Sequence, residues 1–138
     1  MKYGNAKLRY TRTYHLLCKG SINNIKGIFL LDTGASISCL DLEKKAHYGI
    51  DSVGETIEAM DASGNNISAS PTGLCRLKLG RYYIGEHPFM LFDMSSINSG
   101  LAENKCSPVD GFIGGSLLKE LGAQIDYRTM TLRFGLQS

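Results

Sequence analysis

The chain has 138 residues, of which 43% are hydrophobic, so it can bury one core but is too short for two lobes of ordinary domain size. We therefore expect a single domain over residues 1–138. Fifteen basic and thirteen acidic residues leave a net charge of +2, which gives no reason to expect a nucleic-acid or membrane-surface partner. Apolar runs such as residues 28–31 are far too short to cross a bilayer.

Strand patterns, with alternating or continuous apolar residues between glycines, dominate the chain. They cover residues 8–19, 26–31, 55–60, 73–79, 82–92 and 130–134. Strands of this number, joined by tight turns, favour a closed or partly closed antiparallel barrel over a parallel sheet.

Two short segments have helical patterns. One covers residues 40–46 and stops before Gly49, and the other starts at Ser116 as a helix N-cap and ends at Gly122. Residues 93–108 are rich in Ser and Asn and predict a long surface loop. The fold class expected is all-β with one or two short helices.

The cysteines are widely spaced, without a Cys-x-x-Cys pair or a nearby Cys/His group. They are Cys18, Cys39, Cys75 and Cys106. We expect free thiols and no bound metal or other cofactor, and the alternative is two disulfides in an exported protein. The first residues lack the pattern of a signal peptide, so a cytoplasmic location is favoured, with export expected if a signal segment had been removed.

One carboxylate stands out because it ends a run of four apolar residues. Asp32 follows residues 28–31, and Thr33 and Gly34 come directly after it. The strand must deliver this carboxylate to the rim of the core, where Gly34 permits a turn that brings backbone N–H groups towards it. An apolar pair followed by a small turn recurs at residues 112–115.

These two segments, with the helix that follows the second, closely resemble the retropepsin-like aspartic peptidases, which are single-lobe relatives of pepsin. The resemblance covers about residues 10–135. It implies a single-lobe acid-protease barrel in which the Asp-Thr-Gly loop and the later apolar-apolar-Gly segment cross at the site. It also implies a β-hairpin flap between them.

Residues 55–60 and 67–69 have the pattern of the flap's two arms, and residues 61–66 supply a turn. An ordinary surface hairpin is the alternative. The resemblance implies contacts with substrate at the following positions: Ala35, Ala62, Ser63, Gly64, Ile113 and Gly114.

The chain contains one Asp-Thr-Gly, whereas the chemistry needs a base to activate water and an acid to protonate the scissile carbonyl. We therefore predict a homodimer in which a two-fold axis brings two copies of Asp32 together. By resemblance, Thr33 would lock the two loops across the axis, and Gly34 would donate a backbone N–H to the carboxylate.

Three other carboxylates could be mistaken for the second acid, and a catalytic role for one of them would let the chain act as a monomer. Asp110 and Asp126 are expected in turns or caps, and Asp61 is expected to face solvent.

Two departures from relatives affect the expected behaviour. Ala35 lacks the hydroxyl donor that pepsin-like enzymes commonly have, so we expect a mildly acidic activity optimum. Ser36 and Gly115 replace residues that tie many retroviral dimers together, which favours a weak dimer.

The function predicted is aspartic endopeptidase hydrolysis of an extended peptide or protein substrate. The alternative from another class is a noncatalytic dimerisation or peptide-binding module. A serine hydrolase is disfavoured because no Gly-x-Ser-x-Gly is present, and residues 111–116 lack the Lys-Ser/Thr of a phosphate-binding loop.

Overall fold

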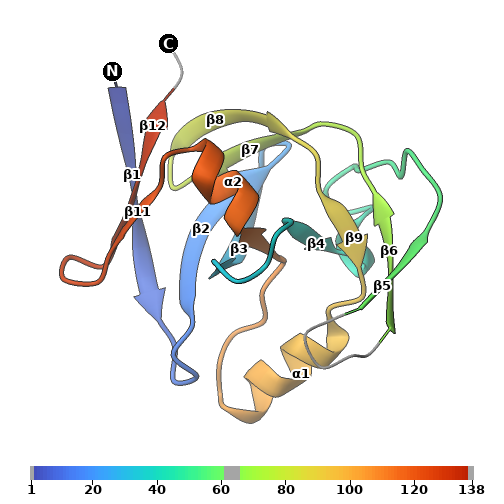
Figure 1. The fold of residues 1–138 in the computed structure, drawn as a ribbon. Helices are drawn as coiled ribbons and strands as arrows, with labels where there is room; N and C mark the ends of the chain where they lie inside the picture. Colours follow the sequence, from blue (N-terminus) through green and yellow to red (C-terminus); the bar gives the residue numbers. More distant parts are fainter. Residues whose placement is uncertain (1, 61–65, 137–138) are drawn as a thin grey trace.

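The computed structural model describes residues 2–60 and 66–136, which form twelve strands, two α-helices and a short 3-10 helix (Figure 1). The elements, in chain order, are β1 (Lys2–Tyr10), β2 (Leu16–Ile22), β3 (Ile25–Asp32), β4 (Cys39–Asp41), η1 (Leu42–Lys44), β5 (Ile57–Met60), β6 (Asn66–Pro71), β7 (Cys75–Leu79), β8 (Tyr82–His87), β9 (Met90–Phe92), α1 (Ser95–Glu103), β10 (Gly111–Gly114), α2 (Gly115–Glu120), β11 (Gln124–Asp126) and β12 (Thr131–Leu136). Neither α-helix in these residues is long and apolar enough to span a membrane.

The strands form one sheet in the order β11-β12-β1-β2-β3-β10-β4-β9-β6-β5, and β7 joins it by pairing with β2 and β8. Most neighbours are antiparallel, whereas β3 pairs with β10 and β4 with β9 in parallel. The predicted all-β fold with short helices is therefore confirmed. The parallel pairs are a feature that the repeated tight turns did not predict.

Two of the predicted strands are each divided in the structure. The strand expected over 8–19 ends at Tyr10 and resumes at Leu16, because the polar residues between them close a turn in which the Thr11 N–H donates to the His15 carbonyl. The strand expected over 82–92 is interrupted at Pro88, which lacks the N–H that a strand ladder requires.

The predicted second helix is present as α2, but the segment 40–46 folds differently from the prediction. It begins as β4, and the 3-10 helix η1 follows for a single turn. Asp41 ends the strand and caps this turn, because its Oδ1 accepts a hydrogen bond from the Glu43 N–H at 3.2 Å. The helix predicted for this segment from local propensity is therefore wrong, because its first residues form the buried strand β4.

The loop predicted over 93–108 is wrong in part, because residues 95–103 form α1. Leu101 is buried in this helix and packs against the same apolar cluster as Leu30 and Phe112. Asp93 lies two residues before the first residue of the helix, and its Oδ1 accepts from the Ser95 N–H at 2.9 Å. Tertiary packing therefore orders a sequence whose Ser and Asn residues favour turns.

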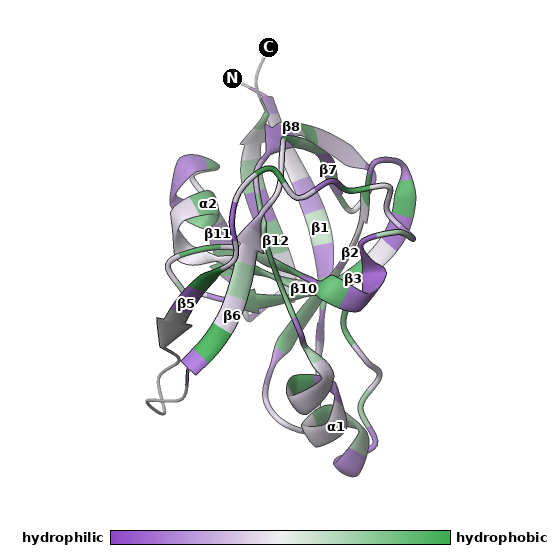
Figure 2. Cartoon of the chain, turned by 90° about the vertical axis from the view of Figure 1, so that its right-hand side faces the viewer, coloured by the Kyte–Doolittle hydropathy of each residue, from purple (hydrophilic) through white to green (hydrophobic). Residues whose placement is uncertain are grey.

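The buried residues form two apolar clusters, one on each face of the central strands. Leu31 and Ile113 belong to the larger cluster, whereas Leu30 and Phe112 belong to the smaller one, which α1 covers. Successive side chains of a strand point to opposite faces, so β3 and β10 each contribute to both clusters. Figure 2 shows α1 and the β5–β6 hairpin projecting from the body of the sheet.

Candidate active site

Asp32 is the last residue of β3, and its side chain is half-buried at the end of the strand. The Gly34 N–H donates to Asp32 Oδ1 at 3.1 Å, as predicted from the resemblance, and the Ala35 N–H donates to the Asp32 carbonyl at 3.1 Å. Thr33 and Gly34 are exposed at the tip of this turn. The carboxylate is therefore held by the backbone of its own loop while the loop tip faces outwards.

The two similar segments of the sequence lie side by side in the structure. Strands β3 and β10 pair in parallel, so that Leu31 faces Ile113 and Asp32 faces Gly114. Both strands end at this last pair of residues, Asp32 and Gly114. Because the strands are in register, the loop after β10 directly adjoins the loop that carries Asp32.

Hydrogen bonds tie these two loops together. The Gly115 N–H donates to the Ala35 carbonyl at 2.6 Å, and the Ser116 N–H donates to the Ser36 carbonyl at 3.2 Å. Residues 33–38 therefore have a conformation that β10 and the start of α2 determine.

Ser38 adds a side-chain bond to this connection. Its hydroxyl accepts a hydrogen bond from the Gly114 N–H at 2.8 Å, and it is 7% exposed. Its carbonyl accepts from the Met90 N–H, so Ser38 joins the loop to β9 as well. The sequence analysis did not identify Ser38 as a residue of the site. The one sequence feature that could have indicated it is its position as a polar residue directly before the apolar pair of β4.

The structure changes one of the predicted substrate contacts. Ile113 is fully buried in the larger cluster, so its side chain has no surface with which to line a substrate cleft. The adjacent Phe112 points to the opposite face of β10, where it is half-buried and packs against the smaller cluster. Gly114 is buried and Ala35 is half-buried beside the loop of Asp32.

The arms of the predicted flap are present as the antiparallel strands β5 and β6, in which Ala59 faces Ile67. The hairpin stands at the edge of the molecule in both views (Figures 1 and 2). Ile67 packs against the smaller cluster, to which Phe112 also belongs. The predicted turn residues Ala62, Ser63 and Gly64 lie outside the described residues, so the role of the hairpin as a lid stays a prediction.

Two of the other carboxylates have structural partners of their own. Asp110 Oδ2 accepts from the Ile28 N–H at 2.8 Å, and Oδ1 lies 3.9 Å from Lys44 Nζ. Ile28 is four residues before Asp32 on β3, about 13 Å of extended strand. Asp126 accepts from the Arg128 and Thr129 N–H groups and therefore shapes a turn, as predicted. Asp61 lies outside the described residues.

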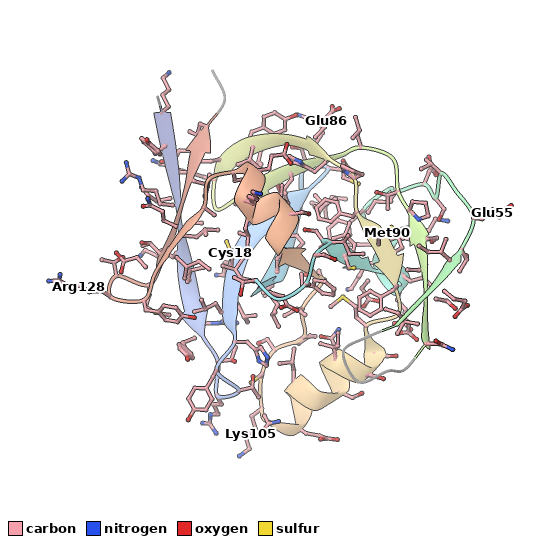
Figure 3. The ribbon with its side chains drawn as sticks, in the orientation of Figure 1. Cys18, Glu55, Glu86, Met90, Lys105 and Arg128 are labelled. Carbon is pink, nitrogen blue, oxygen red and sulfur yellow. The ribbon has the colours of Figure 1, made fainter. Side chains whose placement is uncertain are left out.

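All four cysteines are free thiols. Burial, and after it the charge of Asp32, raise the pKa of Cys39 to about 12 from an ordinary value of 9.0. Burial also raises the pKa of Cys18, labelled on β2 in Figure 3, to about 11. Both thiols are therefore protonated at neutral pH and are poor nucleophiles.

These raised pKa values predict a loss of stability in alkali. The folded-state pKa exceeds the unfolded value, so the stabilisation is complete below pH 9 and is lost as the pH rises towards the folded pKa. We expect the free energy of unfolding to fall by about 1 kcal/mol per thiol between pH 9 and pH 10. Urea denaturation of the protein and of Cys39→Ala measures this, and the variant should show the shallower decline.

The matched control is Cys106→Ala, which removes a half-exposed thiol and should keep the decline of the unaltered protein. A decline of equal steepness in Cys39→Ala would contradict the prediction.

The fold resembles several solved structures. A retropepsin-like aspartic protease from Rickettsia conorii superposes with a TM-score of 0.65 and 22% identity, over 98% of this chain and 92% of that one. The retroviral protease-like domain of Ddi1 from Leishmania major gives a TM-score of 0.57 and 18% identity, over 87% and 85%. EIAV protease, complexed with the inhibitor HBY-793, gives 0.56 and 21%, over 86% and 98%.

No curated protein matches the chain. A family model described as aspartyl protease matches residues 18–117, which is more than half of the chain and includes Asp32, Gly114 and the strands that carry them. The chain therefore belongs to the aspartyl protease family, and its fold is that of the retropepsin-like members.

Proposed function

We propose that the protein is an aspartic endopeptidase in which two copies of Asp32, one from each subunit of a homodimer, activate the attacking water. The observation that carries the proposal is the position of Asp32. It is half-buried at the end of β3, it accepts a bond from the Gly34 N–H, and its loop is bonded to the start of α2. A carboxylate held in this way is oriented before a substrate arrives.

The reaction needs one carboxylate as base and one as acid. Aspartic proteases are the known example of two close carboxylates that share a proton, because both cannot ionise together. The ionised Asp32 would take a proton from water as the water attacks the scissile carbonyl, and the protonated copy would donate to the carbonyl oxygen. Asp110 and Asp126 are engaged elsewhere, so a second chain is the proposed source of the partner.

The sheet order suggests where the second copy would pair. The C-terminal strand β12 is not free to pair with a second chain, because it lies between β11 and β1 and pairs with both. In the described sheet, the order ends at β11 on one side and at β5, an arm of the proposed flap, on the other, so β11 is the end strand outside the flap. An edge strand has unpaired backbone groups, so pairing of β11 with its symmetry mate would extend the sheet across a two-fold axis.

The substrate proposed is an extended peptide that pairs through its backbone and lies between the β5–β6 hairpin and the Asp32 loop. Phe112, with Ile67 at the base of the hairpin, would contact an apolar substrate side chain. The rival function is a noncatalytic dimerisation or peptide-binding module on the same fold. The hydrogen-bonded carboxylate of Asp32 favours the enzyme, since a module that only binds has no need of it.

The test compares the protein with Asp32→Asn on a diverse peptide mixture between pH 4 and pH 7, with and without a pepstatin-type inhibitor. We expect cleavage by the unaltered protein, inhibition by pepstatin, and a loss of rate of about 1,000-fold or more in the variant. Asp93→Asn is the matched control, because that exposed carboxylate bonds only to Ser95 beside it, and its loss should leave the rate within about threefold.

Mass spectrometry of the released fragments provides the measurement. If both Asp32 forms release the same fragments, or neither releases any at a concentration where the protein is dimeric, the peptidase proposal fails. Peptide binding without cleavage would then support the noncatalytic module.

A further inference from the structure

The basic residues are unevenly distributed along the chain. The first 31 residues contain six of the fifteen basic residues and none of the thirteen acidic ones. The six are Lys2, Lys7, Arg9, Arg12, Lys19 and Lys26. These residues lie on β1, β2, β3 and the turn after β1, and the three strands are neighbours in the sheet. The single carboxylate on these three strands is Asp32, at the end of β3, and it forms no ion pair with any of these cations among the described residues.

A groove of about 860 Å³ lies where β1 and the turn between β7 and β8 meet β2. Strand β1 is on the left of Figure 1. Four cations line it and no carboxylate does. They are Lys7 and Arg9 from β1, Lys19 from β2, and Arg81 from the turn. The size is that of a site for a small molecule or for one extended segment of peptide.

A second hollow of about 510 Å³ continues this groove. The two share Lys19, Ile28 and Gly80, and the second adds Lys26 and Asp110. We refer to the two hollows together as the basic groove. Its lining thus has five cations along an elongated path and a single carboxylate at one end.

The five cations are available to a partner. All five side chains are exposed, and none forms an ion pair with a carboxylate in residues 2–60 and 66–136. Asp110 is already engaged with Lys44 and with the Ile28 N–H. Arg81 donates to the Tyr82 hydroxyl at 3.2 Å, which leaves its charge without a carboxylate partner. An anionic ligand would therefore pair with the five cations without breaking an existing ion pair.

The number and spread of the cations argue against a fatty-acid ligand. A fatty acid has a single carboxylate, whereas the five cations lie along the whole groove and suit a ligand with several carboxylates. Of the apolar side chains in the lining, Ala6, Leu8, Leu17 and Cys18 are each 8% exposed or less, and Ile28 is half-buried.

The lining also argues against nucleic acid. Single strands bind by stacking bases on aromatic rings, and Tyr82 is the one aromatic residue of the groove. Its ring packs against Phe134 with 6.1 Å between ring centroids, and the Arg81 guanidinium lies over it at 5.2 Å. Both contacts leave the ring poorly placed to stack on a base.

We propose that the basic groove binds an extended acidic segment of a protein partner, with Glu or Asp side chains paired to Lys7, Arg9, Lys19 and Arg81. Between these charges, the segment would contact the groove's backbone and the aliphatic parts of its Lys and Arg side chains. Ile28, at the centre of the groove, is about 13 Å along β3 from Asp32, so the groove is separate from the catalytic loop. Binding there does not depend on the proposed peptidase activity.

A consequence for selectivity does rest on the proposed function. A peptidase with this groove would prefer protein substrates that carry an acidic segment at a distance from the cleaved bond, because the second contact raises the local concentration of the substrate.

The test uses the full chain with Asp32→Asn, so that the probe is not consumed, and a fluorescein-labelled ten-residue peptide of alternating Glu and Ser. Fluorescence anisotropy should detect binding that weakens as salt rises. The combined variant Lys7→Gln, Lys19→Gln and Arg81→Gln should weaken binding by about tenfold, since each exposed pair contributes a factor of about two. A peptide of alternating Gln and Ser should not bind measurably.

The matched control carries the same change of charge away from the groove, at Lys105→Gln, Lys119→Gln and Arg128→Gln. It should bind the acidic peptide as tightly as the parent chain. Equal weakening by both triple variants, or equal binding of the Gln peptide, would overturn the proposal. Tighter, groove-dependent binding of a ten-base single-stranded DNA would overturn it in favour of nucleic acid. These binding results are independent of whether the protein with Asp32 intact cleaves peptides.

Discussion

Gly114→Ala is expected to lower the free energy of unfolding by about 3 kcal/mol and to remove the proposed peptidase activity. A Cβ at this position would lie 2.3 Å from the Ile37 carbonyl oxygen and 2.6 Å from its carbon. Both are backbone atoms, so no side-chain rotation relieves the overlap. The Asp32 loop and β10 would have to separate, and the bond from the Gly114 N–H to Ser38 would be lost.

Gly100→Ala is the matched control for this substitution, because a Cβ there meets nothing within 4 Å. Gly100 lies within α1, where Ala is the better helix former, so this variant should gain up to about 1 kcal/mol. Urea denaturation measures both variants. If Gly114→Ala were as stable as the parent chain, the close packing of the two loops would be refuted.

Mixing the protein with Asp32→Asn chains tests whether the active site is shared. In a ninefold excess of the variant, about nine in ten intact chains would pair with an inactive one, so activity per intact Asp32 should fall about tenfold. A site complete within one chain would show no fall. Initial rates, taken after the subunits have exchanged, provide the measurement.

The control mixture contains Asp93→Asn chains, which keep Asp32 and should keep the activity per intact Asp32 constant. A tenfold fall in both mixtures would mean that dilution with a variant acts through something other than the catalytic carboxylate. No fall in either would contradict the homodimer.

Local sequence predicted the features that depend on neighbouring residues. The turn at Asp32 and Gly34 follows from a polar residue after four apolar ones, and the arms of the β5–β6 hairpin follow from their alternating pattern. The helix α2 was also predicted, since the helical pattern and the glycine that ends it are adjacent in sequence. Its predicted N-cap, Ser116, is wrong, because the helix begins at Gly115 with Gly114 as its N-cap.

Other features were missed because distant residues determine them. The segment 95–103 is a helix because Leu101 packs on the smaller cluster, although the Ser and Asn residues of the segment favour turns. Ile113 was predicted to contact substrate, but the pairing of β10 with β3 turns its side chain into the larger cluster and leaves Phe112 on the other face. A shift by one residue along a strand reverses the direction of the side chain.

The sequence by itself determined which carboxylate is distinctive and that one copy of it is present, because a short motif and a count of residues contain that information. The tertiary structure decided how Asp32 is held, since Gly114 and Ser38 reach its loop only through the parallel pairing of β3 with β10. It also decided that β12 is an inner strand and that the cations of β1 and β2 share a groove with Arg81. These outcomes depend on contacts between residues far apart in the chain, and local propensity does not specify such contacts.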